Sequence, residues 1–290
     1  LNPLLGLINY CCFVGSGIAS CIAQRKCFVS LRHIQTNLKP LRALLFVGVA
    51  ALALSACASN PMTTGSIGGS ANSGQPLDKK QAALAQLAAH YKKSPGDKAA
   101  IIYYAAALRA NGQNEQAVAV LETGVAKFKN DPDVLVGYAK ALSALGRFDQ
   151  ALNVLDRAIN PTAPDWNALL VKGAILDQSG RNNEARAVYA QALKIAPDQA
   201  SLHANLGLSY SMTNELDKAE SELRIAVKMR GANSQIRQNL ALVVGLQGRF
   251  DESRALFAAE LPADQVEANM SYIRALLTQQ NRWDLVKNSG

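Results

Sequence analysis

The stretch LGRFDQA, at residues 145–151, decides the fold because four variants of it recur along the chain. The variants are NGQNEQA at 111–117, SGRNNEA at 179–185, TNELDKA at 213–219 and QGRFDES at 247–253. Their turn residues are spaced 34 positions apart: Gly112, Gly146, Gly180, Asn214 and Gly248. Glycine supplies a positive φ at little cost, and asparagine is among the few other residues that tolerate it. Five turns in register predict an array of structural repeats.

Residue sizes around the turns predict that each repeat is a pair of helices. Seven positions before each turn residue the side chain is small, as the close approach of two helices requires: Ala105, Ala139, Gly173, Gly207 and Ala241. Nine positions after the turn residue the side chain is large: Leu121, Leu155, Tyr189, Leu223 and Phe257. The period, the turn and this size pattern resemble the tetratricopeptide (TPR) repeat family, whose unit is two antiparallel helices.

The resemblance implies an all-α fold, a TPR solenoid in which the helix pairs stack as a right-handed superhelix. Five full repeats are expected, beginning near Lys98, Pro132, Trp166, Ala200 and Ser234. The expected parts of the solenoid, which covers 77–286 and leaves a tail at 287–290, are a capping helix at 77–93, the five repeats and a closing helical hairpin at 266–286. Ser253, Glu260 and Pro262 depart from the pattern and predict that the last second helix is loosely packed or cut short.

A leader precedes this body. Lys39 and Arg42 are followed by the twelve apolar residues ALLFVGVAALAL at 43–54, too few for a helix to span about 30 Å of hydrocarbon, so we expect a signal peptide at 31–56. LSAC at 54–57 resembles the bacterial lipobox, which implies cleavage before Cys57 and lipidation of its sulfur. An ordinary signal peptide with an incidental cysteine is the alternative. Alanine and serine follow Cys57, where inner-membrane retention usually has aspartate, which favours the outer membrane.

Two segments flank the leader. Residues 1–30 form a second apolar stretch, which we interpret as a translation start placed too far upstream; a first transmembrane helix is the alternative. Residues 57–76 comprise the lipidated cysteine and a run rich in Gly, Ser, Thr, Asn and Pro. Such a composition predicts a flexible linker between the lipid anchor and the repeats.

The net charge of +8 belongs mostly to the leader. Residues 1–57 hold five basic residues and no acidic ones, which leaves 30 − 5 = 25 basic against 22 acidic residues in the body. No block of basic residues remains there, so a nucleic-acid partner is not expected. All five cysteines also precede residue 58, which excludes a disulfide scaffold or a cysteine-based zinc site in the body.

The body carries no pattern typical of catalysis. Its two histidines, His90 and His203, fall in different repeats, and we interpret His203 as a packed or surface residue. No HExxH, GxSxG, GxGxxG or P-loop sequence occurs. We therefore expect no enzymatic activity, no metal, no cofactor and no small-molecule substrate.

The first helix of each repeat lines the concave face of such an array, where partners bind. The positions expected to form a peptide-binding groove are Ile102, Tyr103, Val136, Lys140, Leu170, Asn205, Gln238 and Asn239. The N-terminal half of this set is apolar, and the C-terminal half carries amides that could bond a peptide backbone. Burial of about half of these positions by adjacent repeats is the alternative. The Lys and Asn set that clamps chaperone C termini is missing, since Ile102 and Ala106 occupy two of its places.

The lipobox, the linker and about six TPR units together resemble the TadD lipoprotein family of the tight-adherence (Flp) pilus system. The resemblance implies a non-enzymatic outer-membrane lipoprotein that faces the periplasm. Its expected protein partner is a pilus secretin or another pilus assembly subunit, and its membrane contact is the lipid anchor. The alternatives are a scaffold for envelope or peptidoglycan enzymes and a pilotin of a different type IV pilus system.

Overall fold

The computed structural model describes residues 79–288, and that part of the chain contains helices and no strand. The signal peptide, Cys57 and the linker lie outside the described residues. The helices are α3 (Lys79–Lys93), α4 (Lys98–Ala110), α5 (Asn114–Lys127), α6 (Pro132–Ala144), α7 (Phe148–Ala158), α8 (Trp166–Gln178), α9 (Asn182–Ile195), α10 (Ala200–Met212), α11 (Leu216–Lys228), α12 (Ser234–Leu246), α13 (Phe250–Ala258) and α14 (Ala263–Asn288). The first helices α4, α6, α8, α10 and α12 begin at the five residues that the sequence predicted.

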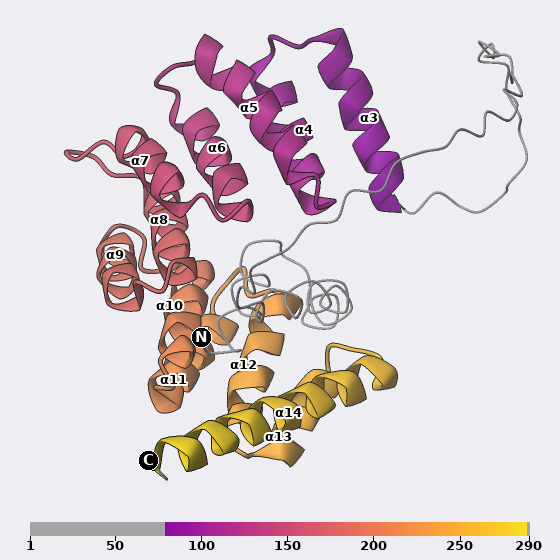
Figure 1. Cartoon of the computed structure of the whole chain (residues 1–290), viewed down its shortest axis with the longest axis vertical. Helices are drawn as coiled ribbons and strands as arrows, with labels where there is room; N and C mark the ends of the chain where they lie inside the picture. The colour runs from indigo at the N-terminus through magenta and orange to yellow at the C-terminus, as the bar shows by residue number, and fades with distance from the viewer. Residues whose placement is uncertain (1–78, 289–290) are drawn as a thin grey trace, which may run out of the picture.

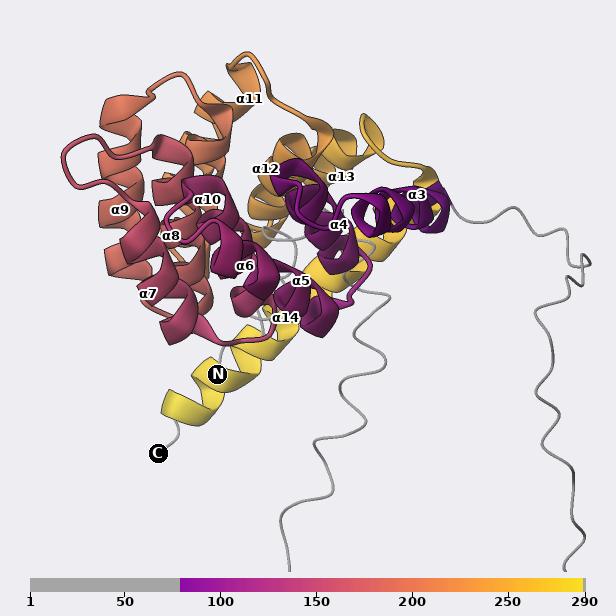
Figure 2. The same ribbon diagram turned by 90° about the horizontal axis from the view of Figure 1, so that it is seen from above.

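The helices stack as five antiparallel pairs. Each first helix packs most closely on the second helix of its own repeat and also contacts the first helix of the next repeat. Figure 1 shows that this stacking bends the array into an arc, with the first helices on its inner side and α5, α7, α9, α11 and α13 on its outer side. Viewed from above, α3 and α9 lie on opposite flanks of the array (Figure 2). The predicted TPR solenoid is confirmed.

The turns have the predicted backbone geometry. Gly112, Gly146, Gly180 and Gly248 have φ between +74° and +83°, and Asn214 has φ +64°. The amide after each of these residues bonds the carbonyl five residues back, as Arg147 N bonds Leu142 O at 3.0 Å. This Schellman-type closure satisfies a carbonyl at the helix end and reverses the chain into the second helix.

Four of the five first helices also begin with a side-chain N-cap, which recurs with the same 34-residue spacing as the turns. Asp97, Asp131, Asp165 and Asn233 each accept a hydrogen bond from the backbone N–H three residues on, at 2.7–3.2 Å. Gln199 occupies the fourth of these five positions and makes no such bond, so α10 lacks a side-chain cap. An oxygen at this place satisfies one of the free N–H groups of the first turn and fixes where the helix begins.

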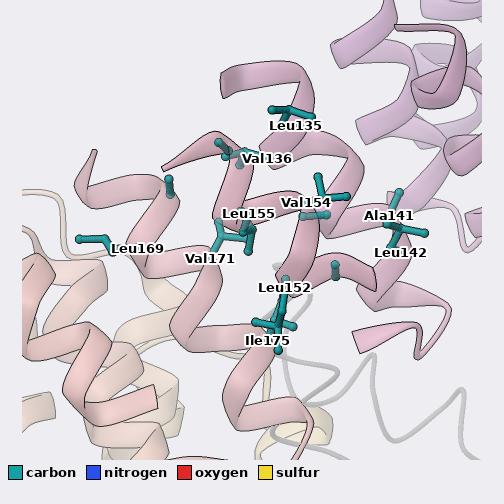
Figure 3. Packing of buried hydrophobic residues seen from close by; sticks show 14 of the residues in the cluster. Leu135, Val136, Ala141, Leu142, Leu152, Val154, Leu155, Leu169, Val171 and Ile175 are labelled. Atoms are coloured by element: carbon teal, nitrogen blue, oxygen red, sulfur yellow. The ribbon is translucent and has the colours of Figure 1, made fainter. Parts of the chain in front are cut away.

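Complementary sizes hold the two helices of a repeat together. Tyr189 is almost fully buried, and a Cβ on Gly173 would lie 2.3 Å from Cε1 of its ring. The small and large positions of the pattern are therefore opposite sides of one contact. Buried aliphatic side chains continue this packing from repeat to repeat; Leu135, Leu142, Leu155 and Ile175 are among those in Figure 3.

The C-terminal end differs from its prediction. Residues 263–288 form the single helix α14, not a helical hairpin, because this stretch contains no glycine or proline at which a turn could form. The second helix of the fifth repeat is cut short at Ala258, as predicted, but it is not loosely packed. Ser253 and Phe257 are fully buried, and Ser253 Oγ donates to Ala241 O at 2.7 Å.

The end of α14 projects beyond the other helices in both views (Figures 1 and 2). Within residues 79–288, no helix is both long and apolar enough to cross a membrane.

Candidate peptide-binding groove

A cavity of about 440 Å³ lies on the inner side of the arc, between the first helices of the first two repeats. Four of the predicted groove residues line it: Ile102, Tyr103, Val136 and Lys140. Ala106 and Arg109 of α4 and Asn167 of α8 complete much of the wall. The structure therefore brings the N-terminal half of the predicted groove together around one hollow.

Tyr103 is the most prominent apolar group of this hollow, with 63% of its surface exposed. Its neighbour in the chain, Tyr104, stacks on Tyr91 of α3 with ring centroids 5.1 Å apart. Tyr104 thus packs on the capping helix α3, while Tyr103 faces the cavity. Ile102 is half-buried and Val136 is buried beneath it, so the floor of the hollow is apolar.

The charges of the cavity separate into two ends. Lys98 donates to Asp131 and Asp133 at 2.9 and 3.0 Å, which neutralises the end formed by the helix N termini. Lys140 and Arg109 lie toward the helix C termini. Burial, and secondarily the charge of Arg109, lower the pKa of Lys140; burial also lowers the pKa of Arg109. Among the described lining residues Asp133 is the one acid, so this second end is cationic.

The remaining predicted groove residues lie outside this cavity. Leu170 is half-buried against the main core cluster. Asn205 Nδ2 donates to Ser201 O at 2.8 Å, and Asn239 Oδ1 accepts from Gln235 Nε2 at 3.0 Å. Gln238 Nε2 donates to Ser234 Oγ at 3.0 Å. These amides bond within their own helices, and Gln238 and Asn239 are only 5% and 6% exposed.

Arg109 and Asn167 are cavity residues that the sequence reasoning missed. A signal for Arg109 was present, because its position holds Ser143, Asp177, Ser211 and Gly245 in the later repeats. A lone arginine among small and acidic residues marks a place where one repeat differs from the others. Comparison of the repeats at this position would have found it.

A second polar cluster lies between the third and fourth repeats, inside the core. Asp177 accepts hydrogen bonds from Ser209 Oγ at 2.7 Å, Asn182 Nδ2 at 2.8 Å and Tyr189 OH at 3.0 Å. Burial raises the pKa of Asp177 to about 6, against the opposing effect of these donors and of Arg186. This cluster ties α8, α9 and α10 together and opens onto no cavity described above.

His203 pairs with an acid: its Nδ1 lies 2.7 Å from Glu222 Oε2. Both side chains are largely buried, which agrees with a packed histidine. Within the described part of the chain, no group of three or more His, Cys, Asp and Glu residues is arranged to hold a metal ion.

Comparison with known families agrees with the geometry. Two family profiles described as "Tetratricopeptide repeat" match the chain, one at residues 81–135 and 108–172 and the other at residues 204–268. A third, described as "TPR repeat", matches residues 173–214. Together they span more than half of the chain. The protein belongs to the tetratricopeptide repeat family.

Solved TPR structures share this fold. A thermophilic TPR protein from Thermus thermophilus is 23% identical over 63% of this chain and 100% of its own, with a TM-score of 0.54. A TPR protein from Parabacteroides merdae is 16% identical over 70% of this chain and 82% of its own, with a TM-score of 0.52. The APC/C hetero-tetramer Cut9–Hcn1 is 14% identical over 68% of this chain and 40% of the matched chain, with a TM-score of 0.54. At such low sequence identity, the structural similarity shows that the fold is shared and nothing more. No curated protein matches the sequence significantly.

Proposed function

We propose that this TPR protein is a non-enzymatic scaffold that holds a segment of a partner protein in the N-terminal half of its inner groove. The observation that carries the proposal is the cavity beside Tyr103, which combines an exposed aromatic ring with an apolar floor formed by Ile102 and Val136. TPR arrays act as protein-interaction scaffolds, and an exposed aromatic beside a concave apolar surface is typical of the centre of a binding site.

We further propose that the scaffold is tethered to the outer membrane, facing the periplasm, through a lipid on Cys57. The lipobox resemblance at residues 54–57 and the composition of residues 58–76 support this address. The combination of lipobox, linker and repeats supports assembly of a tight-adherence (Flp) pilus as the role, with the pilus secretin as partner. The groove would grip the partner, and the lipid would fix the place of assembly.

Partner capture tests the groove. Tyr103→Glu places a charge on the exposed ring position, whereas Ile225→Glu does the same at an apolar residue of α11 that is 40% exposed. Capture of the secretin from solubilised membranes is expected to fall with Tyr103→Glu and to persist with Ile225→Glu. If the two variants capture equal amounts, the binding surface lies elsewhere.

Fatty-acid labelling tests the tether independently. Cells that express the wild-type chain should incorporate labelled palmitate into it, and Cys57→Ala should abolish the label. Label retained by Cys57→Ala would refute the anchor but leave the groove untouched.

A further inference from the structure

We propose that Lys140 is a nucleophilic amine that captures apolar aldehydes in the cavity between α4 and α6, as a reversible Schiff base. The step modifies the protein and is not catalysis. The inference goes beyond the proposed function, because it requires only the amine and the cavity and no partner protein.

The cavity is lined by two lysines in opposite environments. Lys98 donates to Asp131 at 2.9 Å and to Asp133 at 3.0 Å, and these hydrogen bonds raise its pKa. Lys140 of α6 is half-buried, and within the described part of the chain no acid pairs with it and no acceptor bonds its ammonium group. At neutral pH the carboxylates hold the proton on Lys98, whereas nothing comparable holds it on Lys140.

The surroundings of Lys140 favour the neutral amine. Burial lowers the pKa of Lys140, and the charge of Arg109 lowers it further. Burial is the larger cause, so the effect does not require Arg109 to be unpaired. Only the neutral amine has a lone pair that can attack a carbonyl carbon, and a lysine in a partly apolar hollow beside a second cation is a known form of activated nucleophile.

The other large cavity provides a contrast. It has a volume of about 420 Å³ and is lined from α7, α8 and α9, and its lysine, Lys172, donates to Asp156 at 2.7 Å. Of the lysines that line these two cavities, Lys140 is the one without an acidic partner among the described residues. An unpaired amine is therefore a feature of the inner cavity that the outer one does not share.

The apolar lining selects the carbonyl compound. Ile102 and Val136 form the floor, and the exposed ring of Tyr103 borders it. An aromatic aldehyde can place its ring against these groups while its carbonyl carbon reaches the amine. The cavity volume of about 440 Å³ lies in the range of small-molecule sites.

The reaction needs no oxidant or reductant. Nζ of neutral Lys140 attacks the carbonyl carbon and forms an N–C bond, while one electron pair of the C=O bond moves to oxygen. A proton passes from nitrogen to that oxygen and gives a carbinolamine. Loss of the second N–H proton together with the hydroxyl group releases water and leaves a C=N bond. Addition of water reverses both steps, so the capture is reversible.

The test traps the adduct in the full chain, kept in mild detergent at pH 7. Benzaldehyde is added with cyanoborohydride, which reduces the C=N bond to a stable benzylamine, and the modified peptides are quantified by mass spectrometry. Lys140 is expected to be labelled severalfold faster than Lys98 and Lys172. Raising the pH to about 10.4, where an ordinary lysine is half deprotonated, should reduce the difference. Equal labelling of the three lysines at pH 7 overturns the inference.

Matched variants test the cause of the reactivity. Ala106 lines the same cavity, so Ala106→Asp places a carboxylate there, which should raise the pKa of Lys140 and slow its labelling at pH 7. Ala106→Asn has the same size without the charge and should leave the rate near that of the wild type. Lys140→Arg keeps the positive charge and should lose the fast-labelled site. If Ala106→Asp and Ala106→Asn label Lys140 equally fast, charge does not control the amine and the proposal fails.

Acetaldehyde tests the apolar lining. It has the same reactive group as benzaldehyde but no ring, so its preference for Lys140 over Lys98 should be smaller than that of benzaldehyde. An equal preference with the two aldehydes would overturn the choice of apolar aldehydes as the ligand class.

Discussion

Tyr103 and Asn239 occupy the same position of the repeat, four periods apart, yet 63% of Tyr103 is exposed and only 6% of Asn239. The same contrast holds at a second inner position, where Ala106 and Lys140 line the cavity and Leu208 and Leu242 are buried. Leu208 and Leu242 belong to a cluster with Met270 of α14. One repeat pattern thus produces an open groove at the N-terminal end and a closed face at the other.

The difference teaches that repeat position alone does not determine function. In the first two repeats the inner face lines a cavity, so its side chains are available to a partner. In the fifth repeat the same face joins the core that packs on α14, and its side chains stabilise the fold. Binding and stability variants should therefore separate along the array.

The largest effect is expected from truncating the closed face. Leu242→Ala removes a side chain that is 4% exposed and should lower the free energy of unfolding by about 2–5 kcal/mol, as core truncations do. Ala106→Leu, at the equivalent open position, should change stability by less than about 0.5 kcal/mol and should weaken peptide binding by filling the cavity. Urea unfolding followed by circular dichroism measures the first effect, and fluorescence anisotropy measures the second. Equal losses of stability at the two positions would remove the distinction between the two faces.

The next effect is the pH dependence of the stability that the buried Asp177 contributes to the fold. Because burial raises its folded pKa to about 6, above the unfolded value, Asp177 binds a proton more readily in the folded state, and its contribution to stability rises as the pH falls through 6 toward 4. Asp177→Asn keeps the size of the side chain but cannot titrate. The stability of the wild type relative to Asp177→Asn should therefore decrease by about 2–3 kcal/mol between pH 4 and pH 8.

Denaturant midpoints of both proteins across this pH range provide the measurement. Taking the difference cancels the opposite trend of the salt-bridged carboxyls, such as Glu215 and Glu220, whose pKa values are lowered. A pH-independent difference would show that Asp177 stays ionised or stays protonated throughout.

A smaller effect on stability is expected from replacing two glycines, Gly173 at a contact between two helices and Gly137 in the wall of the cavity. Gly173→Ala would drive a Cβ into the ring of Tyr189 and should destabilise the protein by about 1–3 kcal/mol. Gly137→Ala on α6 meets only a Leu121 methyl at 3.3 Å and should be neutral or gain up to about 1 kcal/mol from its better helix propensity. Thermal unfolding of the two variants compares them directly, and the account fails if Gly137→Ala is the more damaging one.

The sequence predicted the repeats because their determinants are local. The turn glycines, the small residue before each turn and the large residue after it specify each helix pair without reference to the rest of the chain. The C-terminal hairpin was wrong because the sequence NRWDLV resembles a turn in its polar and aromatic residues but lacks the glycine that reverses the chain.

The site was less accessible to this reasoning. Periodicity placed Tyr103 and Asn239 on the same face, but how deeply each is buried depends on what packs over that face. Arg109 was missed because the reasoning looked for residues that the repeats share, and Arg109 differs from the residues at its position in the other repeats. The charge of a groove is set by these departures, not by the repeat.

The most direct test of the open and closed ends is the alkylation of single cysteines at one repeat position. Tyr103→Cys and Asn239→Cys are each treated with iodoacetamide, and the modified peptides are quantified by mass spectrometry. We predict fast modification at position 103 and slow modification at position 239, since the two residues are 63% and 6% exposed. Equal rates at the two positions would contradict the account.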